Sequence, residues 1–198
     1  MNDHNGHDQT GTALLDPPAS VSDPALQAGE ASELSIEPAR WEDARQVVQI
    51  IRSSAEWYEE FVAPEDMDEH FVDMDWAREN FQRREFHVAR LGGEIAGTIS
   101  LQEVGDDHLY LGYVYLHTDH VGNGFGGDLL DFARDELKRR GRHSMFLIAH
   151  PEAVWAKRAY LRYGFEIIAD TDEEVLEWND GWLEPYYEEG FQLYEYRI

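Results

Sequence analysis

The sequence predicts an α+β fold with about four helices and a sheet that begins as an antiparallel meander. Residues 86–116 contain three apolar segments separated by short turns, which is typical of neighbouring antiparallel strands. From residue 122 onward, helical patterns alternate with short apolar runs, which indicates that helices connect the later strands. Residues 33–198 are expected to form one domain, because this length can bury a core of its own.

The first half of the chain is expected to contain two helical stretches before the meander. Order is expected to begin near Leu34, in a short strand that Pro38 ends. Apolar residues recur at helical spacing over 41–52, and a second helical stretch is expected from Pro64 to Phe81. The expected strands and turns of the meander are 86–89, a turn at 92–93, 95–101, a turn at 106–107, and 109–116.

The second half alternates between helices and strands. The expected elements are a helix that follows the glycine-rich segment 122–127 and that Gly141 ends, a strand over 145–149, a helix over 152–162, and strands over 165–169 and 191–197. Residues 170–190 are acidic and aromatic, and their pattern predicts no particular element. Residues 1–32 are rich in Asn, Asp, Gly, Ser and Pro, which predicts a disordered acidic tail.

The charge of the chain narrows the classes of partner. It has 41 acidic and 16 basic residues, a net charge of −25, only two lysines and no cysteine. The absence of a basic stripe argues against nucleic acid as a partner. A surface this acidic repels itself unless salt screens it, and molar salt reduces the Debye length to about 3 Å. Adaptation to high salt is therefore the favoured interpretation, and a cationic partner such as a polyamine is the other.

The compartment is expected to be the cytoplasm, without membrane contact. The N-terminus lacks the basic start and apolar stretch of a signal peptide, and no apolar run is long enough to span a bilayer. The lack of cysteine excludes a disulfide framework and a cysteine–histidine metal site, and no metal is expected.

A glycine-rich loop, residues 122–127, lies between a strand and a helix. It fits the G-x-G-x-x-G pattern of dinucleotide-binding folds, but it follows an antiparallel meander with about seventy residues remaining, so that fold is rejected. The remaining interpretations are a tight turn without a ligand and a site where backbone N–H groups bind an anion. The second is favoured, because a helix N-terminus attracts phosphate without any lysine.

Several residues resemble the signatures of the GNAT (GCN5-related N-acetyltransferase) superfamily. Its Q/R-x-x-G-x-G/A motif is matched at Gly124 and Gly126, with Val121 in place of the usual Gln or Arg. A second pattern, A-x-x-x-Y-x-x-x-G-F, is matched by residues Ala156, Tyr160, Gly164 and Phe165, with Ala153 where an Asn is common. The order of elements fits from about residue 33 to 198, and the composition suggests a haloarchaeal-type member.

The resemblance implies a central, mostly antiparallel mixed sheet that is splayed between its fourth and fifth strands. Acetyl-CoA would lie in the opening as co-substrate, with its pyrophosphate on the glycine loop. The cofactor-binding residues implied are Tyr115, Leu116, Val121, Gly122, Asn123, Gly124, Phe125, Gly126 and Gly127.

The reaction implied is direct attack of a primary amine on the thioester. It needs a base for the amine, a donor that polarises the carbonyl, and an acid for the leaving thiolate. Tyr160 matches the family's acid, and the N–H of Leu116 would polarise the carbonyl. Glu103 is the candidate base, and His117 and His120 are weaker ones that a solvated surface also explains.

The acceptor is expected to be a small molecule or a peptide with an amine. Aromatic residues flanked by acids suit a cationic amine, although core packing explains them equally well. These aromatic residues are Trp57, Tyr58, Phe61, Trp178, Trp182, Tyr186 and Tyr187. The competing function is a non-catalytic CoA-binding or regulatory module. The apolar final strand is also a candidate for pairing between subunits, which would give a homodimer.

Overall fold

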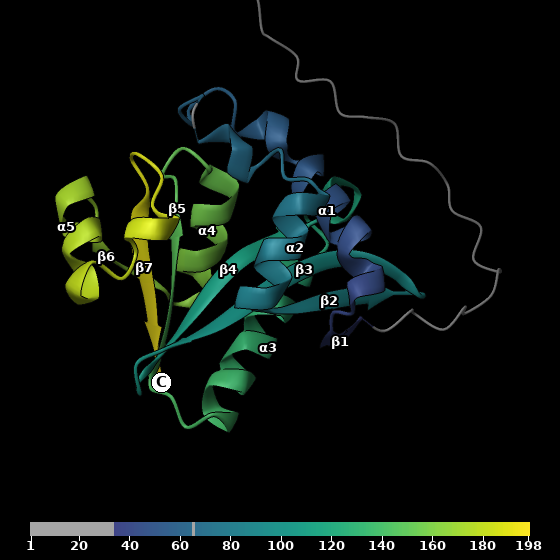
Figure 1. Cartoon of the computed structure of the whole chain (residues 1–198). Helices are drawn as coiled ribbons and strands as arrows, with labels where there is room; N and C mark the ends of the chain where they lie inside the picture. The colour runs from purple at the N-terminus through teal and green to yellow at the C-terminus, as the bar shows by residue number, and fades with distance from the viewer. Residues whose placement is uncertain (1–33, 65) are drawn as a thin grey trace, which may run out of the picture. The chain divides into compact units, whose positions relative to one another are not determined.

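Figure 1 shows the computed structural model, which describes residues 34–64 and 66–198. Seven strands form one sheet in the order β1-β2-β3-β4-β5-β7-β6. Their bounds are β1 Ser35–Pro38, β2 Glu85–Leu91, β3 Glu94–Val104, β4 His108–Leu116, β5 Ser144–Ala149, β6 Glu166–Ala169 and β7 Gln192–Arg197. Every neighbouring pair is antiparallel except β4 and β5, which are parallel. The expected α+β class with a mixed sheet is confirmed.

Five α-helices in the described part of the chain cover the two faces of the sheet. They are α1 Ala44–Ser53, α2 Met74–Arg83, α3 Phe125–Arg139, α4 Val154–Tyr163 and α5 Asp172–Glu177. Helices α1 and α2 lie on one face of the β2–β4 half, and α3 lies on the opposite face (Figure 1). The additional helix relative to the sequence expectation is α5, which falls in the stretch without a predicted element.

The second helix is shorter than expected. It begins at Met74, not at Pro64, because the side chain of Asp73 accepts hydrogen bonds from the N–H groups of Asp75 and Trp76, both at 2.9 Å. Such an N-cap satisfies donors that the first helical turn leaves unpaired. The residues before Asp73 instead include a short 3-10 turn, Met67–Glu69.

Two apolar layers hold the sheet between its helices. The larger core packs α3 and α4 against the face of β4, β5 and β7 that carries Leu109, Met145 and Tyr194. The opposite face of the sheet carries Phe146 and Leu193, which pack against α5 and the aromatic segment after it. The period-two alternation of each strand divides its side chains between the two layers.

The final strand is not available for pairing between subunits. Strand β7 is hydrogen bonded to β5 on one side and to β6 on the other, so both of its edges are used within the chain. The expected route to a homodimer through this strand is therefore wrong. The strands at the edges of the sheet are β1 and β6.

Residues 1–32, the expected acidic tail, lie outside the described residues. Within residues 34–64 and 66–198, no helix combines the length and the apolar character that a membrane crossing requires.

Candidate functional site

The sheet opens between β4 and β5. These strands pair only where His108–Tyr110 meets Ser144–Phe146, and the rest of β4 continues without β5 as its partner. The splay expected between the fourth and fifth strands is thus present. Residues on either side of the opening line two cavities, one toward α3 and α4 and one toward α2 and the segment before β7.

The cavity toward α3 and α4, called the groove below, has a volume of about 590 Å³. The structure brings seven of the nine expected cofactor-binding residues to its wall: Tyr115, Leu116, Val121, Gly122, Gly124, Gly126 and Gly127. The other two, Asn123 and Phe125, do not line it. The Asn123 amide donates to the carbonyl of His120 at 3.3 Å, and the Phe125 ring also lies beside His120.

The glycine loop is shaped to present backbone to this groove. Gly122 and Gly124 have φ values of +89° and +92°, which side chains rarely tolerate. Gly124 is also the N-cap of α3, whose first N–H groups lack helical partners. A Cβ atom at Gly127 would meet nothing within 4 Å, so packing does not require a glycine there. A ligand that approaches the backbone closely would explain the glycine at this position, whereas packing within the protein does not.

The N–H of Leu116 points into the opening. The next residue along β4, His117, donates its N–H to the carbonyl of Ala96 on β3 at 2.8 Å. Because successive N–H groups of a strand point to opposite sides, the Leu116 N–H faces away from β3. That side of β4 is the splayed side, where a carbonyl oxygen can accept the bond.

Tyr160 lies between the two cavities. It belongs to α4, which ends at Gly164 with a φ of +112°, and it lines both the groove and the second cavity. Its ring packs near those of Phe165 and Tyr194. Burial raises the pKa of Tyr160 well above its usual value, so the phenol stays protonated at neutral pH. A protonated phenol in this place can donate a proton to a group bound across the two cavities.

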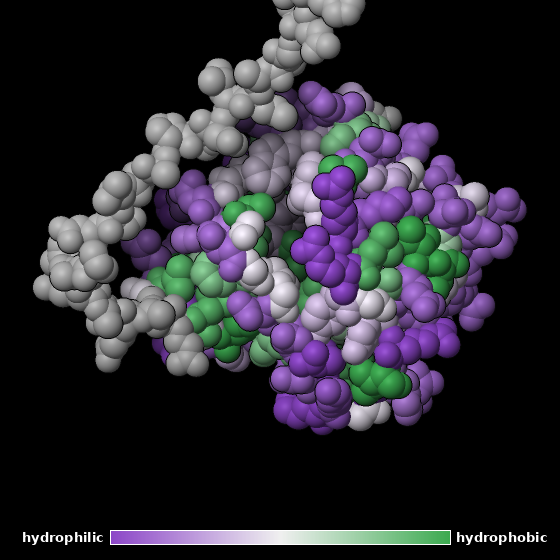
Figure 2. Space-filling view, turned by 180° about the vertical axis from the view of Figure 1, so that it is seen from behind, coloured by the Kyte–Doolittle hydropathy of each residue, from purple (hydrophilic) through white to green (hydrophobic). Residues whose placement is uncertain are grey.

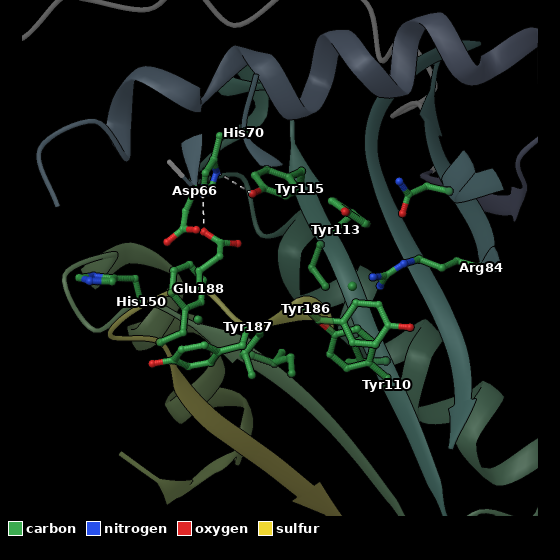
Figure 3. Close-up of a pocket in the computed structure, with 18 of the residues that line it drawn as sticks. Asp66, His70, Arg84, Tyr110, Tyr113, Tyr115, His150, Tyr186, Tyr187 and Glu188 are labelled. Atoms are coloured by element: carbon green, nitrogen blue, oxygen red, sulfur yellow. Dashed lines mark hydrogen bonds and ion pairs between the residues drawn. The ribbon is translucent and has the colours of Figure 1, made fainter. Parts of the chain in front are cut away.

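The second cavity, called the acceptor pocket below, has a volume of about 400 Å³ (Figure 3). Three tyrosines of one strand, Tyr110, Tyr113 and Tyr115, line it together. Simple alternation would place Tyr110 on the opposite face from the other two. A bulge in β4 prevents this, because the register shifts between Thr98 and Ser100 on β3 and Tyr113 has a φ of +48°.

One side of the acceptor pocket carries a hydrogen-bonded chain. Nε2 of His70 lies 3.2 Å from Oε2 of Glu188, and the phenol of Tyr115 lies 3.3 Å from Nδ1 of His70. The ring of Tyr58 stacks on the imidazole at 4.1 Å between centroids, and burial raises the pKa of Tyr58 to about 12. His70 is only 2% exposed, so its position is fixed by packing as well as by hydrogen bonds.

Glu103, the expected base, lies elsewhere. It pairs with Arg140 and Arg142, and it lines neither cavity. Its partner across the sheet is Leu109, near the start of β4, whereas the opening lies near the end of that strand. The structure therefore does not bring Glu103 together with Tyr160. His117 and His120 also lie outside both linings, and His117 contacts Asp119.

The aromatic residues expected around the acceptor divide into two groups. Tyr58, Tyr186 and Tyr187 line the acceptor pocket, and Trp57 lines the groove. The other three do not line either cavity: Phe61 stacks on His150 at 4.7 Å, while Trp178 and Trp182 pack on Phe146. Core packing explains these three.

Sequence reasoning missed His70 and Arg84, and it named Glu188 only as one of the acids that flank the aromatic residues around the acceptor. His70 and Glu188 are separated by 118 positions, so no local motif joins them. Arg84 lies at the junction of α2 and β2 and reaches the acceptor pocket from the side opposite to His70 (Figure 3). The one signal in the sequence was indirect, namely the acids and aromatic residues gathered in 184–188.

The comparison with protein families agrees with this geometry. The family described as "Acetyltransferase (GNAT) family" matches residues 48–165 of the chain. The chain belongs to the GNAT acetyltransferase family. No curated protein sequence matches it.

Solved structures share the GNAT fold at low sequence identity. PaiA N-acetyltransferase from Thermoplasma acidophilum, in complex with coenzyme A, matches with a TM-score of 0.63 and 18% identity over 84% of this chain and 99% of that one. A GNAT acetyltransferase from Staphylococcus aureus Mu50 matches with a TM-score of 0.64 and 14% identity, over 83% of this chain and 99% of that one. YncA from Salmonella typhimurium, solved with acetyl-CoA, matches with a TM-score of 0.61 and 18% identity, over 84% of this chain and 94% of that one.

The two residues that depart from the GNAT signatures, Val121 and Ala153, each line one of the two cavities. Val121 is exposed at the wall of the groove, where it offers no side-chain donor to an anion. Arg162 on α4 is an exposed residue that lines the same groove. Ala153 is buried at the N-terminus of α4 and lines the acceptor pocket.

Proposed function

We propose that this GNAT protein transfers the acetyl group of acetyl-CoA to a primary amine by direct attack, with residues 33–198 as the acetyltransferase domain. The observation that carries the proposal is the position of Tyr160, whose side chain lines both the groove and the acceptor pocket. A cofactor in the groove and an amine in the pocket would meet beside a protonated phenol. That arrangement suits a leaving thiolate that needs a proton.

The groove is the proposed site of acetyl-CoA. The glycine loop would hold the pyrophosphate through backbone N–H groups at the start of α3. Arg162 would supply the positive charge that Val121 lacks. The Thermoplasma and Salmonella proteins of the same fold hold coenzyme A and acetyl-CoA, which supports a ligand of this class.

Different residues of the chain would have different roles in the reaction. Acetyl-CoA supplies an acetyl group activated as a thioester. The N–H of Leu116 would bind the carbonyl oxygen and stabilise the negative charge that it gains. As the new C–N bond forms and the C–S bond breaks, Tyr160 would give its proton to the sulfur. The amine gives up its own proton to a base.

We assign the base to Glu188, assisted by His70, in place of Glu103. The Glu188 carboxylate lines the acceptor pocket, and its bond with His70 fixes its orientation. An ammonium group bound there would have a carboxylate to receive its proton before attack. Glu103 is instead bound to two arginines outside the pocket.

We further propose that the protein is a salt-adapted, haloarchaeal-type member that works in the cytoplasm. Hydrophilic side chains cover much of the face drawn in Figure 2, with smaller hydrophobic areas between them. With a net charge of −25, such a surface gains from concentrated salt, which screens its repulsion.

Calorimetry with acetyl-CoA in about 2 M KCl tests the proposal, since at that salt the repulsion is screened. Binding in the micromolar range, about −8 kcal/mol, is expected, together with release of the CoA thiol when amines are added. The chain has no cysteine, so a thiol reagent reports the product alone. Absence of binding by the folded protein would sink the proposal, and binding without turnover of any amine would favour the non-catalytic module.

A further inference from the structure

The acceptor pocket holds a cation whose purpose the proposed reaction does not explain. The guanidinium of Arg84 lies against three tyrosine rings, with Cζ 4.5 Å from the centroid of Tyr186, 4.9 Å from Tyr113 and 5.3 Å from Tyr110. Burial raises the pKa of Tyr110 to about 12, even though Arg84 acts to lower it. The phenol therefore stays neutral, and the charge of Arg84 is not cancelled by a phenolate.

The strand beneath Arg84 is adapted to receive it. A Cβ atom at Gly112 would collide with Nη1 of Arg84 and would come within 2.8 Å of Oγ of Ser100. The glycine lets the guanidinium lie directly on β4. Nη1 of Arg84 and Oγ of Ser100 are both buried without a hydrogen-bond partner among the described residues. A buried polar group without a partner is costly, so this placement calls for a reason.

Arg84 is also kept apart from carboxylates in a chain that is rich in them. Seven arginines form ion pairs with Asp or Glu: Arg78, Arg90, Arg134, Arg139, Arg140, Arg142 and Arg197. Among the described residues, no carboxylate oxygen lies within 4.0 Å of the Arg84 guanidinium. Cζ of Arg84 lies within cation–π distance of three rings, and Arg84 also makes a side-chain hydrogen bond with Tyr110. A guanidinium has five N–H donors, so one such bond leaves others that can bind an anion.

The opposite side of the pocket has the reverse charge. Glu188 and Asp66 line it there, next to His70 (Figure 3). Arg84 and Glu188 thus stand on opposite sides of one cavity of about 400 Å³. A diamine bound with one nitrogen at Glu188 would bring its second positive charge toward Arg84, which disfavours it.

We infer that the acceptor is an amino acid or another amine that also carries a carboxylate. Arg84 holds the carboxylate through its N–H edge, while Glu188 and His70 hold the amine that is acetylated. This inference rests on the proposed acetyl transfer and names the substrate class of the same pocket. Guanidinium and carboxylate match in geometry, and a charge-assisted pair of this kind discriminates strongly against a neutral amide.

The test compares acids with their amides, in binding and in turnover. The binding probes are the N-acetyl derivatives of glycine, β-alanine, γ-aminobutyrate, leucine and phenylalanine, each paired with its N-acetyl amide. The turnover probes are the same five amino acids, each paired with its amide and its decarboxylated amine. At least one acid is expected to exceed its amide by about 20-fold or more in affinity and in kcat/KM. The best chain length reports the spacing of the two charged sides.

Variants of Arg84 assign the preference to this residue. Arg84→Gln is expected to bring the acid-to-amide ratio close to one, and Arg84→Lys to retain part of it, because lysine keeps the charge but loses the planar edge. Arg78→Gln, on the helix that precedes Arg84, is the matched control, since Arg78 is exposed and pairs with Asp75 outside the pocket. It is expected to keep the full ratio.

Three outcomes would overturn the inference: amides or simple amines used as well as the acids, no acid bound or acetylated, or an equal loss for acid and amide in Arg84→Gln. In the last case Arg84 would serve only to pack the tyrosines. Binding of acetyl-CoA, measured on the same samples, separates this failure from a failure of the proposed function. A protein that binds acetyl-CoA and acetylates only carboxylate-free amines keeps the function and loses the inference.

Discussion

The phenol of Tyr115 and the imidazole of His70 are hydrogen bonded, with 3.3 Å between Oη and Nδ1. On its other side the imidazole lies 3.2 Å from Glu188. If Nε2–H donates to the carboxylate, Nδ1 is left as the acceptor of the Tyr115 hydroxyl, so a single tautomer satisfies both contacts. The chain of groups connects β4, the turn after Met67–Glu69 and the segment before β7. It therefore fixes the orientation of Glu188 in the acceptor pocket.

Replacing the proposed base is expected to slow the reaction most where the amine is protonated. Glu188→Gln should lower kcat/KM by about 10²-fold near neutral pH, because the amide cannot take the proton of the ammonium. The loss should shrink as the pH approaches the pKa of the amine, where the nucleophile is already neutral. Steady-state rates of thiol release as a function of pH measure this.

The neighbouring variant Glu189→Gln is the control for that experiment. Glu189 is exposed and does not line the acceptor pocket, so its rates should follow the wild type at every pH. A loss in Glu188→Gln that is the same at all pH values would argue for a role in binding alone.

The glycine loop allows folding and cofactor binding to be separated. Gly126 lies in the first turn of α3, and a Cβ atom there would meet only Cδ1 of Leu116, at an ordinary 3.9 Å. Gly126→Val should therefore leave the melting temperature close to that of the wild type. It should weaken acetyl-CoA binding by about 10-fold or more, since the added methyl groups stand where the pyrophosphate would approach the backbone.

Asp128→Val serves as the control in the same helical turn. Asp128 is exposed and lines neither cavity, so its replacement should leave the affinity for acetyl-CoA unchanged or slightly higher as a negative charge is removed. Equal affinity of Gly126→Val and the wild type would show that the loop does not hold the cofactor.

Local sequence patterns predicted most of the fold and the glycine loop that lines the groove. The meander, the glycine loop and the helix that Gly164 ends all depend on residues near one another in sequence, so their patterns predict them. The start of α2 was missed because the cap at Asp73 depends on one side chain rather than on periodicity. The position of β7 was missed because pairing on both edges is a property of the whole sheet.

Most of the acceptor pocket could not be predicted from the sequence, for two physical reasons. The bulge at Tyr113 breaks the period of two along β4, so alternation assigns Tyr110 and Tyr115 to opposite faces when they share one. Acids are too frequent in this chain for any one to stand out, and Glu103, the candidate base, faces two arginines on β3 and lines neither cavity. The proposed base, Glu188, lies beside His70 through a contact between residues 118 positions apart, which no local pattern predicts.

An acid-sensitive ion pair network links α3 to the sheet. Hydrogen bonds from Arg139 and then Arg140 lower the pKa of Glu136 to about 2, from 4.5 ordinarily. A carboxyl group with a lowered pKa in the folded state stabilises it above the unfolded pKa, and this contribution disappears as the pH falls from about 4.5 to about 2. Glu136→Gln should thus be less stable than the wild type by about 1 kcal/mol at neutral pH, after allowance for screening at the surface.

Denaturant unfolding of both proteins at constant ionic strength measures the effect. The difference between them should be full at pH 7 and should vanish near pH 2. Glu174→Gln is a comparison outside this network: hydrogen bonds with Asp170 and Thr171 at the start of α5 lower the pKa of Glu174 too, so this variant reports acid sensitivity that arises away from Glu136. A difference between wild type and Glu136→Gln that persisted at low pH would mean that packing, rather than charge, is what Glu136 contributes.

Removing one hydroxyl group separates the enzyme from a non-catalytic module. Tyr160→Phe keeps the ring against Phe165 and Tyr194 but removes the proton that the thiolate would receive. Turnover should fall by about 10²-fold or more, while acetyl-CoA affinity stays within about 2-fold of the wild type. Tyr163→Phe is the matched control, since Tyr163 lies on the same helix, lines only the groove and donates to Asp131 at 2.9 Å. It should retain turnover, and a wild-type rate in Tyr160→Phe would mean that another group, or water, protonates the leaving thiolate.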